Sequence, residues 1–257
     1  MDSVHPTCRC RRTRTSCPRR ARAELRVEAL EERTLLSLTL INDINPAPLL
    51  PAEITGAGGN VYFVTKASGG GAELNVETAT GPKILKEFPA PNSIIDELTP
   101  DGSKLFFFAT PALYLGDQLW VTNGTRAGTR LVENTSPGGI LGETTVVGKE
   151  LYFASSGTGS SPQPLLYKTN GTAAGTVPIA NPVASATSHD SFTEGMVNDG
   201  GVVYFGFGNQ LMKTNGVTSK VVGSFGPRPS TVPDLGSVSV LTDAGGVLYF
   251  TSRDPSQ

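Results

Sequence analysis

The segment VVGKELYF, residues 146–153, decides the fold, because four variants of it recur along the chain. The five copies end at aromatic residues that are 44, 46, 52 and 45 positions apart, namely Phe63, Phe107, Phe153, Phe205 and Phe250. Each copy follows a glycine-containing turn signal (GAGG, PDGS, VVGK, NDGG or DAGG), and such signals provide the positive φ angles that a tight hairpin needs. A signature at nearly constant spacing indicates an internal structural repeat.

Each repeat unit contains four short strands. The strand that ends in phenylalanine is the second, and a leucine marks the third at Leu74, Leu119, Leu166 and Leu211. A short apolar run forms the fourth, and prolines that suit a sheet edge close the units at Pro89, Pro137, Pro182 and Pro227. The first strand of a unit precedes its turn signal, as in ETTVVG or SVSVLT. Four strands in about 45 residues are the period and strand count of a β-propeller blade.

We therefore expect an all-β fold, a β-propeller of about five four-stranded blades. One small sheet cannot cover its own apolar faces, so the aromatic residues of neighbouring blades must pack together. The predicted inter-blade core is Tyr62, Phe63, Phe106, Phe107, Trp120, Tyr152, Phe153, Tyr204, Phe205, Tyr249 and Phe250.

The repeat domain is expected over residues 35–257, with units that end near residues 47, 91, 137, 182 and 229 and a partial unit to 257. The last unit contains only the strands SVSVLT and VLYFTS, and SLTLINDINP near the start of the chain resembles the last strand of a unit. Pairing of these two ends would complete a five-bladed ring. An open ring, or the opening segment of a longer propeller, is the alternative.

The string LYKTNGTAAGT (166–176) is similar to LWVTNGTRAGT (119–129), and a shorter version follows at 211–218. It lacks the lysine of a phosphate-binding loop, and a strand-like segment follows its glycines where a dinucleotide loop needs a helix. We therefore interpret it as a structural bend between the third and fourth strands. The predicted bend residues are Asn123, Gly124, Thr125, Gly128, Asn170, Gly171, Thr172, Gly175, Asn215 and Gly216. Three Asn-X-Ser/Thr matches, at Asn123, Asn134 and Asn170, are attributed to turn chemistry.

These copies resemble the ELWxxDGT repeat, whose units read approximately ELWKTDGTxxGTxLVKDINPG. The strongest matches are QLWVTNGTRAGTRLVENTSPGG and LLYKTNGTAAGTVPIANP, and LINDINPA (40–47) matches the tail of the repeat. The resemblance covers about residues 38–257 and implies propeller-like repeats. Asn123, Asn170 and Asn215 stand where the family usually has aspartate, and both residue types tolerate left-handed backbone.

Residues 1–34 are expected to form a separate basic leader. They contain nine arginines and five acids, a net charge of +4, whereas the rest of the chain carries −6. A short amphipathic helix is predicted around AELRVEALEER, and LRVEALEERTLLS (25–37) resembles an LExRxLLS-type bacterial export motif. The resemblance implies export to the cell surface or the medium. His5, Cys8, Cys10 and Cys17 are possible zinc ligands, but the C-x-C spacing is atypical of zinc sites and favours an unstructured leader.

Few residues of the repeat domain are candidates for catalysis or metal binding. Its single histidine, His189, adjoins Asp190, but no G-x-S-x-G segment and no second histidine accompany them. The acid pairs Asp96-Glu97 and Asp190/Glu194 have the chemistry of glycosidase carboxylates. We predict no catalytic, cofactor or metal site.

The variable connections provide the functional hypothesis. Loop lengths differ most between the second and third strands and between successive units, and both kinds of connection leave the same end of a propeller. Residues 109–117, 155–164 and 183–198 are therefore the candidate contact surface. We expect a non-catalytic exported protein that binds an extracellular protein or glycan, without nucleic-acid binding or a membrane span. A carbohydrate-active propeller enzyme, or a fragment of a longer repeat protein with no independent function, is the alternative.

Overall fold

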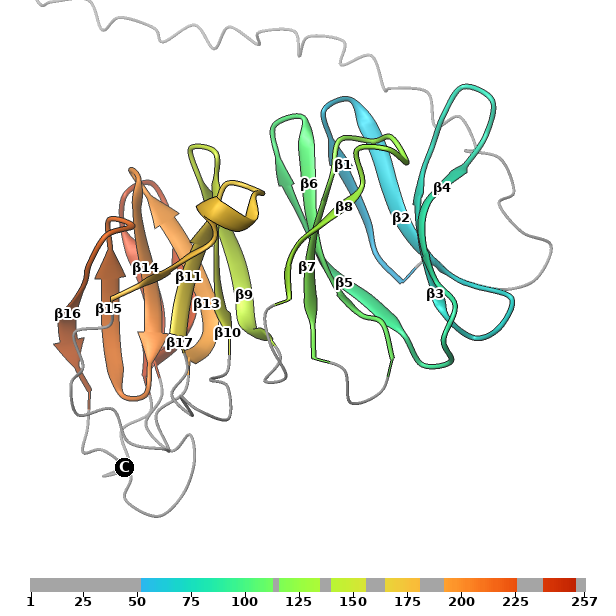
Figure 1. Ribbon diagram of the computed structural model, residues 1–257. Helices are drawn as coiled ribbons and strands as arrows, with labels where there is room; N and C mark the ends of the chain where they lie inside the picture. Colours follow the sequence, from blue (N-terminus) through green and yellow to red (C-terminus); the bar gives the residue numbers. More distant parts are fainter. Residues whose placement is uncertain are drawn as a thin grey trace, which may run out of the picture. The chain divides into compact units, whose positions relative to one another are not determined.

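The computed structural model describes residues 52–112, 116–134, 140–155, 165–180, 192–225 and 238–252. All of them belong to one compact unit, 42–257. The predicted leader, the strand SLTLINDINP, most of the residues 155–164 and His189 with Asp190 lie outside the described residues. Within them the chain forms antiparallel sheets joined by turns, with one short 3₁₀ helix, η1 (Ala173–Gly175) (Figure 1).

Five sheets follow one another along the chain, each with its strands in sequence order. Sheet 1 contains β1 (Ile54–Ala57), β2 (Asn60–Lys66), β3 (Ala72–Val76) and β4 (Lys83–Phe88); sheet 2 contains β5 (Ile94–Asp101), β6 (Lys104–Thr110), β7 (Gln118–Thr122) and β8 (Arg130–Asn134); sheet 3 contains β9 (Ile140–Val147), β10 (Glu150–Ser155), β11 (Leu165–Thr169) and β12 (Val177–Ile179); sheet 4 contains β13 (Phe192–Asp199), β14 (Val202–Phe207), β15 (Gln210–Thr214) and β16 (Ser219–Ser224); sheet 5 contains β17 (Val238–Asp243) and β18 (Leu248–Ser252). The predicted all-β fold with four-stranded units is confirmed in sheets 1–4, and sheet 5 has the two strands expected of the partial unit.

In sheets 1–4 the turn signals form two-residue hairpins between the first and second strands, whereas the connection in sheet 5 has four residues, 244–247. In sheet 1, Ala57 pairs with Asn60 across Gly58 and Gly59, whose φ angles are 57° and 80°. The equivalent hairpin of sheet 4 uses Gly200 and Gly201. Two consecutive positive φ angles define the hairpin turn that matches the twist of the strands.

Consecutive sheets pack face to face through four separate apolar clusters. The side chains of a strand alternate between its two faces, so each second strand contributes one aromatic residue to each neighbouring sheet. In sheet 2, Phe107 packs in the cluster shared with sheet 1, and Phe106 packs in the cluster shared with sheet 3. Sheets 3 and 4 share a third cluster around Tyr152 and Phe205, and a fourth joins sheets 4 and 5. We call the face toward the following sheet the forward face and the opposite one the backward face.

Nine of the eleven predicted inter-blade aromatics pack in these clusters, Trp120 among them; Phe63 is buried but belongs to none of the four, and Tyr249 is exposed. The forward aromatics are Tyr62, Phe106, Tyr152 and Tyr204, and the backward ones are Phe107, Phe153, Phe205 and Phe250. Tyr249 was expected to be buried, and this expectation was wrong, because the side chain is 59% exposed. Tyr249 is the forward aromatic of sheet 5, and no later sheet exists in the described part of the chain to cover it.

The first strands of the sheets lie next to one another. The first strands of every two consecutive sheets, from sheet 1 to sheet 5, are in contact. The Thr99 and Thr144 hydroxyls, from β5 and β9, are hydrogen bonded at 2.6 Å. In sheets 2–5 the pairing of the first and second strands is interrupted by a bulge, for example between Asp96 and Thr99 in β5. The bulge is thus a recurring part of the unit.

Candidate functional site

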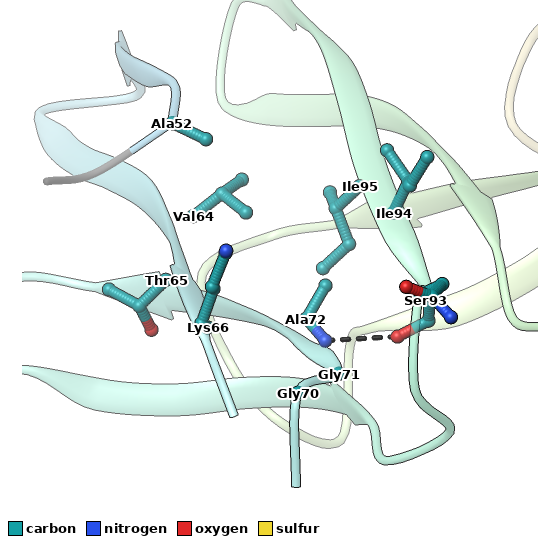
Figure 2. A pocket seen from close by; sticks show the side chains of 11 residues that line it. Ala52, Val64, Thr65, Lys66, Gly70, Gly71, Ala72, Ser93, Ile94 and Ile95 are labelled. Carbon is teal, nitrogen blue, oxygen red and sulfur yellow. Dashed lines mark hydrogen bonds between the residues drawn. The ribbon is translucent and has the colours of Figure 1, made fainter. Parts of the chain in front are cut away.

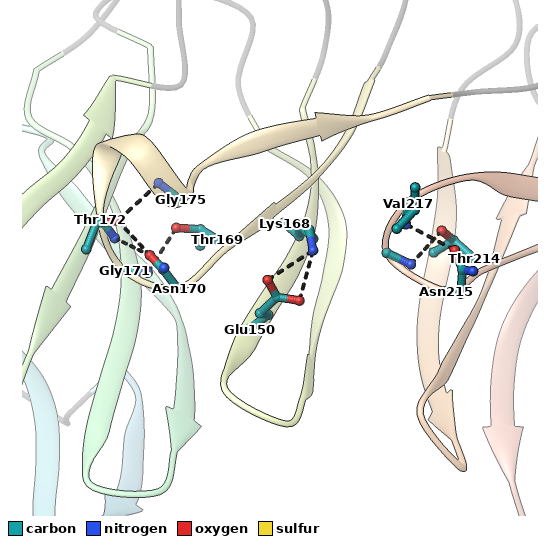
Figure 3. Close-up of polar contacts among 11 residues, drawn as sticks. Glu150, Lys168, Thr169, Asn170, Gly171, Thr172, Gly175, Thr214, Asn215 and Val217 are labelled. Atoms are coloured by element: carbon teal, nitrogen blue, oxygen red, sulfur yellow. Dashed lines mark hydrogen bonds and ion pairs between the residues drawn. The ribbon is translucent and has the colours of Figure 1, made fainter.

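The Asn-Gly strings form the bends between the third and fourth strands of sheets 2, 3 and 4. In sheet 3, Asn170 Oδ1 accepts hydrogen bonds from the Thr172 amide at 3.0 Å and from its hydroxyl at 2.7 Å (Figure 3). The Thr169 hydroxyl accepts from the Gly171 amide at 3.0 Å, and the Thr172 hydroxyl accepts from the Gly175 amide at 3.0 Å. The same network surrounds Asn123 in sheet 2. These bonds satisfy the backbone of the bend internally, as a structural turn requires.

The glycines of these bends receive the forward aromatic residue of the preceding sheet. Gly124, Gly171 and Gly216 have φ angles of 86°, 87° and 85°. A Cβ atom at Gly124 would lie 2.8 Å from the Tyr62 hydroxyl, and one at Gly171 would lie 3.3 Å from Phe106. Gly216 has the same relation to Tyr152. The glycine in each string is therefore needed both for its backbone conformation and for contact between sheets.

In the two longer strings, those of sheets 2 and 3, the second glycine packs against the asparagine. A side chain at Gly128 would overlap the Asn123 amide, and one at Gly175 would overlap the Asn170 amide. All the predicted bend residues thus have a role in the turn or in packing.

The opposite end of sheets 1 and 2 has a pocket of about 330 Å³. Its walls are the end of β2, the loop from β2 to β3 and the connection from β4 to β5 (Figure 2). The lining residues are Ala52, Val64, Thr65, Lys66, Gly70, Gly71, Ala72, Asn92, Ser93, Ile94 and Ile95. These connections are of the two kinds whose lengths vary between units, so the pocket lies at the end expected to diversify.

Ser93 fixes the wall of this pocket. It is buried, its hydroxyl donates to the Phe88 carbonyl at 2.7 Å, and it accepts from the Ala72 amide at 2.9 Å. The adjacent Asn92 has a φ of 63°, and its backbone N–H donates a hydrogen bond to the Gly70 carbonyl at 3.2 Å. Two connections distant in sequence are thereby joined, so the pocket is formed before a ligand binds.

The pocket combines apolar walls with one cationic side chain. Val64 and Ile95 are buried, whereas Ile94 is 52% exposed at the rim. Lys66 lines the pocket from the end of β2. This arrangement fits a ligand that has an apolar portion beside an anionic or carbonyl group.

Three carboxylates, Glu53 before β1, Asp96 in β5 and Asp117 before β7, lie near one another at this end of sheets 1 and 2. Burial, with the neighbouring charges of Asp117 and Glu53, raises the pKa of Asp96 from 3.8 to about 6. Glu53 accepts hydrogen bonds from the Glu97 and Leu98 amides at 3.3 and 3.1 Å, and thus links sheet 1 to the bulge in sheet 2. Asp117 accepts a hydrogen bond from the Thr110 hydroxyl. Glu97 has a φ of 54°, an uncommon angle for a residue other than glycine.

The sequence predictions included only some of the residues that form this end of sheets 1 and 2. They included Asp96-Glu97 and, within 109–117, Asp117, but they did not include Glu53 or the pocket residues. The signal for the pocket was the run Gly69-Gly70-Gly71, which allows close approach of the chain, together with Asn92-Ser93. Glu194 lies in β13, and its side chain is outside the described part.

Over the described ranges, no three histidine, cysteine or acidic side chains are grouped as metal ligands. No helix in the same ranges has the length and apolar character needed to cross a bilayer.

Comparison with solved structures shows the fold class. A prolyl endopeptidase structure superimposes with a TM-score of 0.51 and 13% identity, over 75% of this chain and 30% of that one. For a puromycin-hydrolyzing peptidase from Mycobacterium tuberculosis the TM-score is 0.46 and the identity 12%, over 79% of this chain and 34% of that one. For an uncharacterized protein from Listeria monocytogenes EGD-e the TM-score is 0.42 and the identity 11%, over 69% of this chain and 54% of that one. The chain thus spans about a third to a half of the length of these proteins. Neither a protein-family model nor a curated protein matches the sequence. The fold is β-propeller-like, and identities this low concern the fold alone.

Proposed function

We propose that this protein is an exported, non-catalytic binding module whose propeller-like sheets present a ligand site at the end opposite the Asn-Gly bends. The observation that carries the proposal is the preformed pocket between the variable connections of sheets 1 and 2. The repeated bends supply rigidity, and the non-repeated connections supply recognition. The resemblance of residues 25–37 to an export motif supports a location outside the cytoplasm.

The ligand class follows from the lining. Exposed Ile94 and the buried Val64 and Ile95 favour an apolar portion, and the Lys66 ammonium favours a carboxylate or carbonyl next to it. An acylated or carboxylated sugar, or an apolar peptide segment, has this chemistry. The ligand is therefore an extracellular glycan or protein.

A screen on the full chain tests the proposal. Acidic and N-acylated glycans and a peptide library are tested for binding, and the hits are measured by calorimetry against Ile94→Asp. Ile84→Asp, at an exposed isoleucine of β4, is the matched control. We expect Ile94→Asp to abolish binding and Ile84→Asp to retain it. Equal affinity for both variants would place the ligand elsewhere, and no hit among these classes would refute the proposal.

A second candidate function, hydrolysis of carbohydrates, is favoured by the raised pKa of Asp96 next to Asp117. Glycosidases use a pair of neighbouring carboxyl groups, one of which has a raised pKa and acts as the general acid. Assays with aryl glycosides would show turnover that decreases above about pH 6 and disappears in Asp96→Asn. Turnover that is unchanged in this variant would exclude Asp96 as the acid.

A further inference from the structure

Two adjoining hollows lie at the end of sheets 1 and 2 that holds the bends between the third and fourth strands. The first, of about 690 Å³, is enclosed by the bend of sheet 1, the start of β4 and the bend of sheet 2. The second, of about 400 Å³, continues along β4 and shares Leu85 and Arg126 with the first. We call these two hollows together the bend groove. It is separate from the pocket at the opposite end of the same two sheets.

The bend groove has a local excess of positive charge. Lys83 and Lys86 of β4 and Arg126 of the sheet 2 bend line it, and Glu87 is the carboxylate among the lining residues. The nearby Glu77 does not line it. Lys83 and Arg126 are exposed, and within the described part of the chain none of the three cations forms an ion pair. The groove is thus a positive site on a repeat domain whose net charge is −6.

Two of the three cations start from fixed positions. The Lys86 ammonium lies 4.4 Å from the centre of the Trp120 ring and 5.2 Å from that of Phe88, which are cation–π contacts. The Arg126 carbonyl accepts a hydrogen bond from the Thr129 backbone N–H at 3.3 Å inside the bend. Groups that are ordered before binding lose less entropy when a ligand binds. The groove therefore presents its charge in a defined arrangement.

The other polar groups of the groove have partners within the bends. The Thr125 hydroxyl donates to Asn123 Oδ1 at 2.7 Å and accepts from the Gly128 amide at 3.0 Å. The Thr78 hydroxyl donates to the Gly81 carbonyl at 2.6 Å. The groove thus offers a ligand separate cationic side chains rather than a cradle of free amides around a single phosphate group. This chemistry fits a chain that bears several negative groups.

The combination of cations is specific to the junction of sheets 1 and 2. The strand register aligns Lys83 with Arg130 in sheet 2 and Val177 in sheet 3. Arg126 corresponds to Ala173 in the sheet 3 bend and to Thr218 in the sheet 4 bend. The junction of sheets 2 and 3 therefore has one cation at these two positions, and that of sheets 3 and 4 has none. A shared structural requirement of the bends does not explain the pair Lys83 and Arg126.

We propose that the bend groove is a second binding site and that its ligand is an acidic polysaccharide, a chain of sugars that bear carboxylate or sulfate groups. A groove of this size accommodates one flexible chain, and its three cations are spread along β4 and the facing bend. The negative net charge of the repeat domain opposes contact with a broad, densely charged surface such as duplex nucleic acid or an anionic membrane.

Two double variants of the full chain test this site. Lys83→Gln with Arg126→Gln removes two cations of the groove. Lys213→Gln with Lys220→Gln, at exposed lysines of β15 and β16, is the matched control for the loss of two positive charges. Each chain is titrated by calorimetry with oligogalacturonate, which carries carboxylates, with dextran sulfate, and with neutral dextran. The basic leader is the same in every chain, so a difference between the variants reports on the groove.

A second measurement locates the bound chain. Lysines of the wild-type protein are acetylated with and without saturating oligosaccharide and mapped by mass spectrometry. Residues 1–34 contain no lysine, so this labelling does not report on the leader. We expect Lys83 and Lys86 to be protected and Lys213 and Lys220 to be labelled as before.

We expect the groove variant to bind at least one of the two acidic chains about fivefold or more weakly than the control variant, because each exposed ion pair contributes a factor of about two to five. The difference should vanish at about 0.5 M salt, where surface charges are screened. Ile94→Asp, in the opposite pocket, should leave this binding unchanged, so the site can fail or stand independently of the proposed function.

The proposal is overturned if the two double variants bind the acidic chains equally, if neutral dextran binds as tightly, or if Lys83 is acetylated at the same rate with and without ligand. It is also overturned if single-stranded oligothymidylate binds more tightly with the same dependence on Lys83 and Arg126, because a nucleic acid would then be the ligand.

Discussion

Substitution of Asp96 by asparagine should change the pH dependence of stability in a defined direction. The pKa of Asp96 is raised from 3.8 to about 6, so the folded state holds a proton that the unfolded state releases between these pH values. Stability contributed by this group is therefore full below about pH 4 and decreases as the pH rises to about 6. Asparagine has a similar shape and no charge, so Asp96→Asn should avoid this loss.

The magnitude follows from the same values. A pKa change from 3.8 to about 6 corresponds to about 3 kcal/mol, at 1.36 kcal/mol per pKa unit. Asp96 is partly exposed, and solvent screening reduces this to about 1–2 kcal/mol. We therefore expect Asp96→Asn to be more stable than wild type by about 1–2 kcal/mol at pH 7, with a difference close to zero at pH 4.

The assay is urea unfolding at pH 4, 5, 6 and 7, followed by circular dichroism and by fluorescence of Trp120, the only tryptophan. Glu87→Gln, at an exposed residue of β4, controls for the loss of one negative charge. A stability difference between Asp96→Asn and wild type that is the same at pH 4 and pH 7 would contradict a raised pKa of Asp96 in the folded state. So would a difference that grows toward acid pH.

Three further predictions concern packing between the sheets. Phe153→Ala, at a fully buried side chain, should lower the free energy of unfolding by about 3–5 kcal/mol, whereas Tyr249→Ala should change it by less than about 0.5 kcal/mol; similar losses for both would contradict the assignment of the faces. Gly171→Ala combines positive φ with a clash against Phe106 and should cost more than Gly81→Ala, which has positive φ in open space; chemical denaturation measures both, and equal costs would exclude the aromatic contact. Glu53→Ala leaves the Glu97 and Leu98 amides without their carboxylate and should cost about 1–3 kcal/mol, with faster hydrogen exchange at these amides; unchanged exchange would exclude this link between sheets 1 and 2.

The repeat made most of the fold predictable from the sequence. The aromatic-ended strands and their glycine turns are local signals, and five copies at similar spacing fixed the strand order and the sheet boundaries. The exposure of Tyr249 was not predicted, because its local sequence matches that of buried Tyr152 and partly buried Tyr204. The difference depends on whether a further sheet covers the position, which is not encoded within the unit.

The candidate site was less predictable for a related reason. Asp96 was visible as half of an acid pair, but its raised pKa results from burial and from Asp117 and Glu53, which are distant in sequence. The pocket likewise brings together the loop around Gly70 and the connection at Ser93. Repetition identifies what the units share, whereas recognition depends on connections that occur once.

Consecutive sheets stack with their first strands side by side, and a disulfide crosslink between two of these strands is the decisive test of that arrangement. Thr99 and Thr144 are replaced by cysteine in a chain with Cys8, Cys10 and Cys17 changed to serine. Because the two hydroxyls are 2.6 Å apart, mild oxidation should crosslink most molecules without unfolding them, as peptide mapping by mass spectrometry would show. The control chain carries Thr99→Cys and Lys220→Cys, the latter in the fourth strand of sheet 4, and these two cysteines should remain reduced. Crosslinking of the Thr99–Thr144 pair no faster than this control would contradict the stacked arrangement.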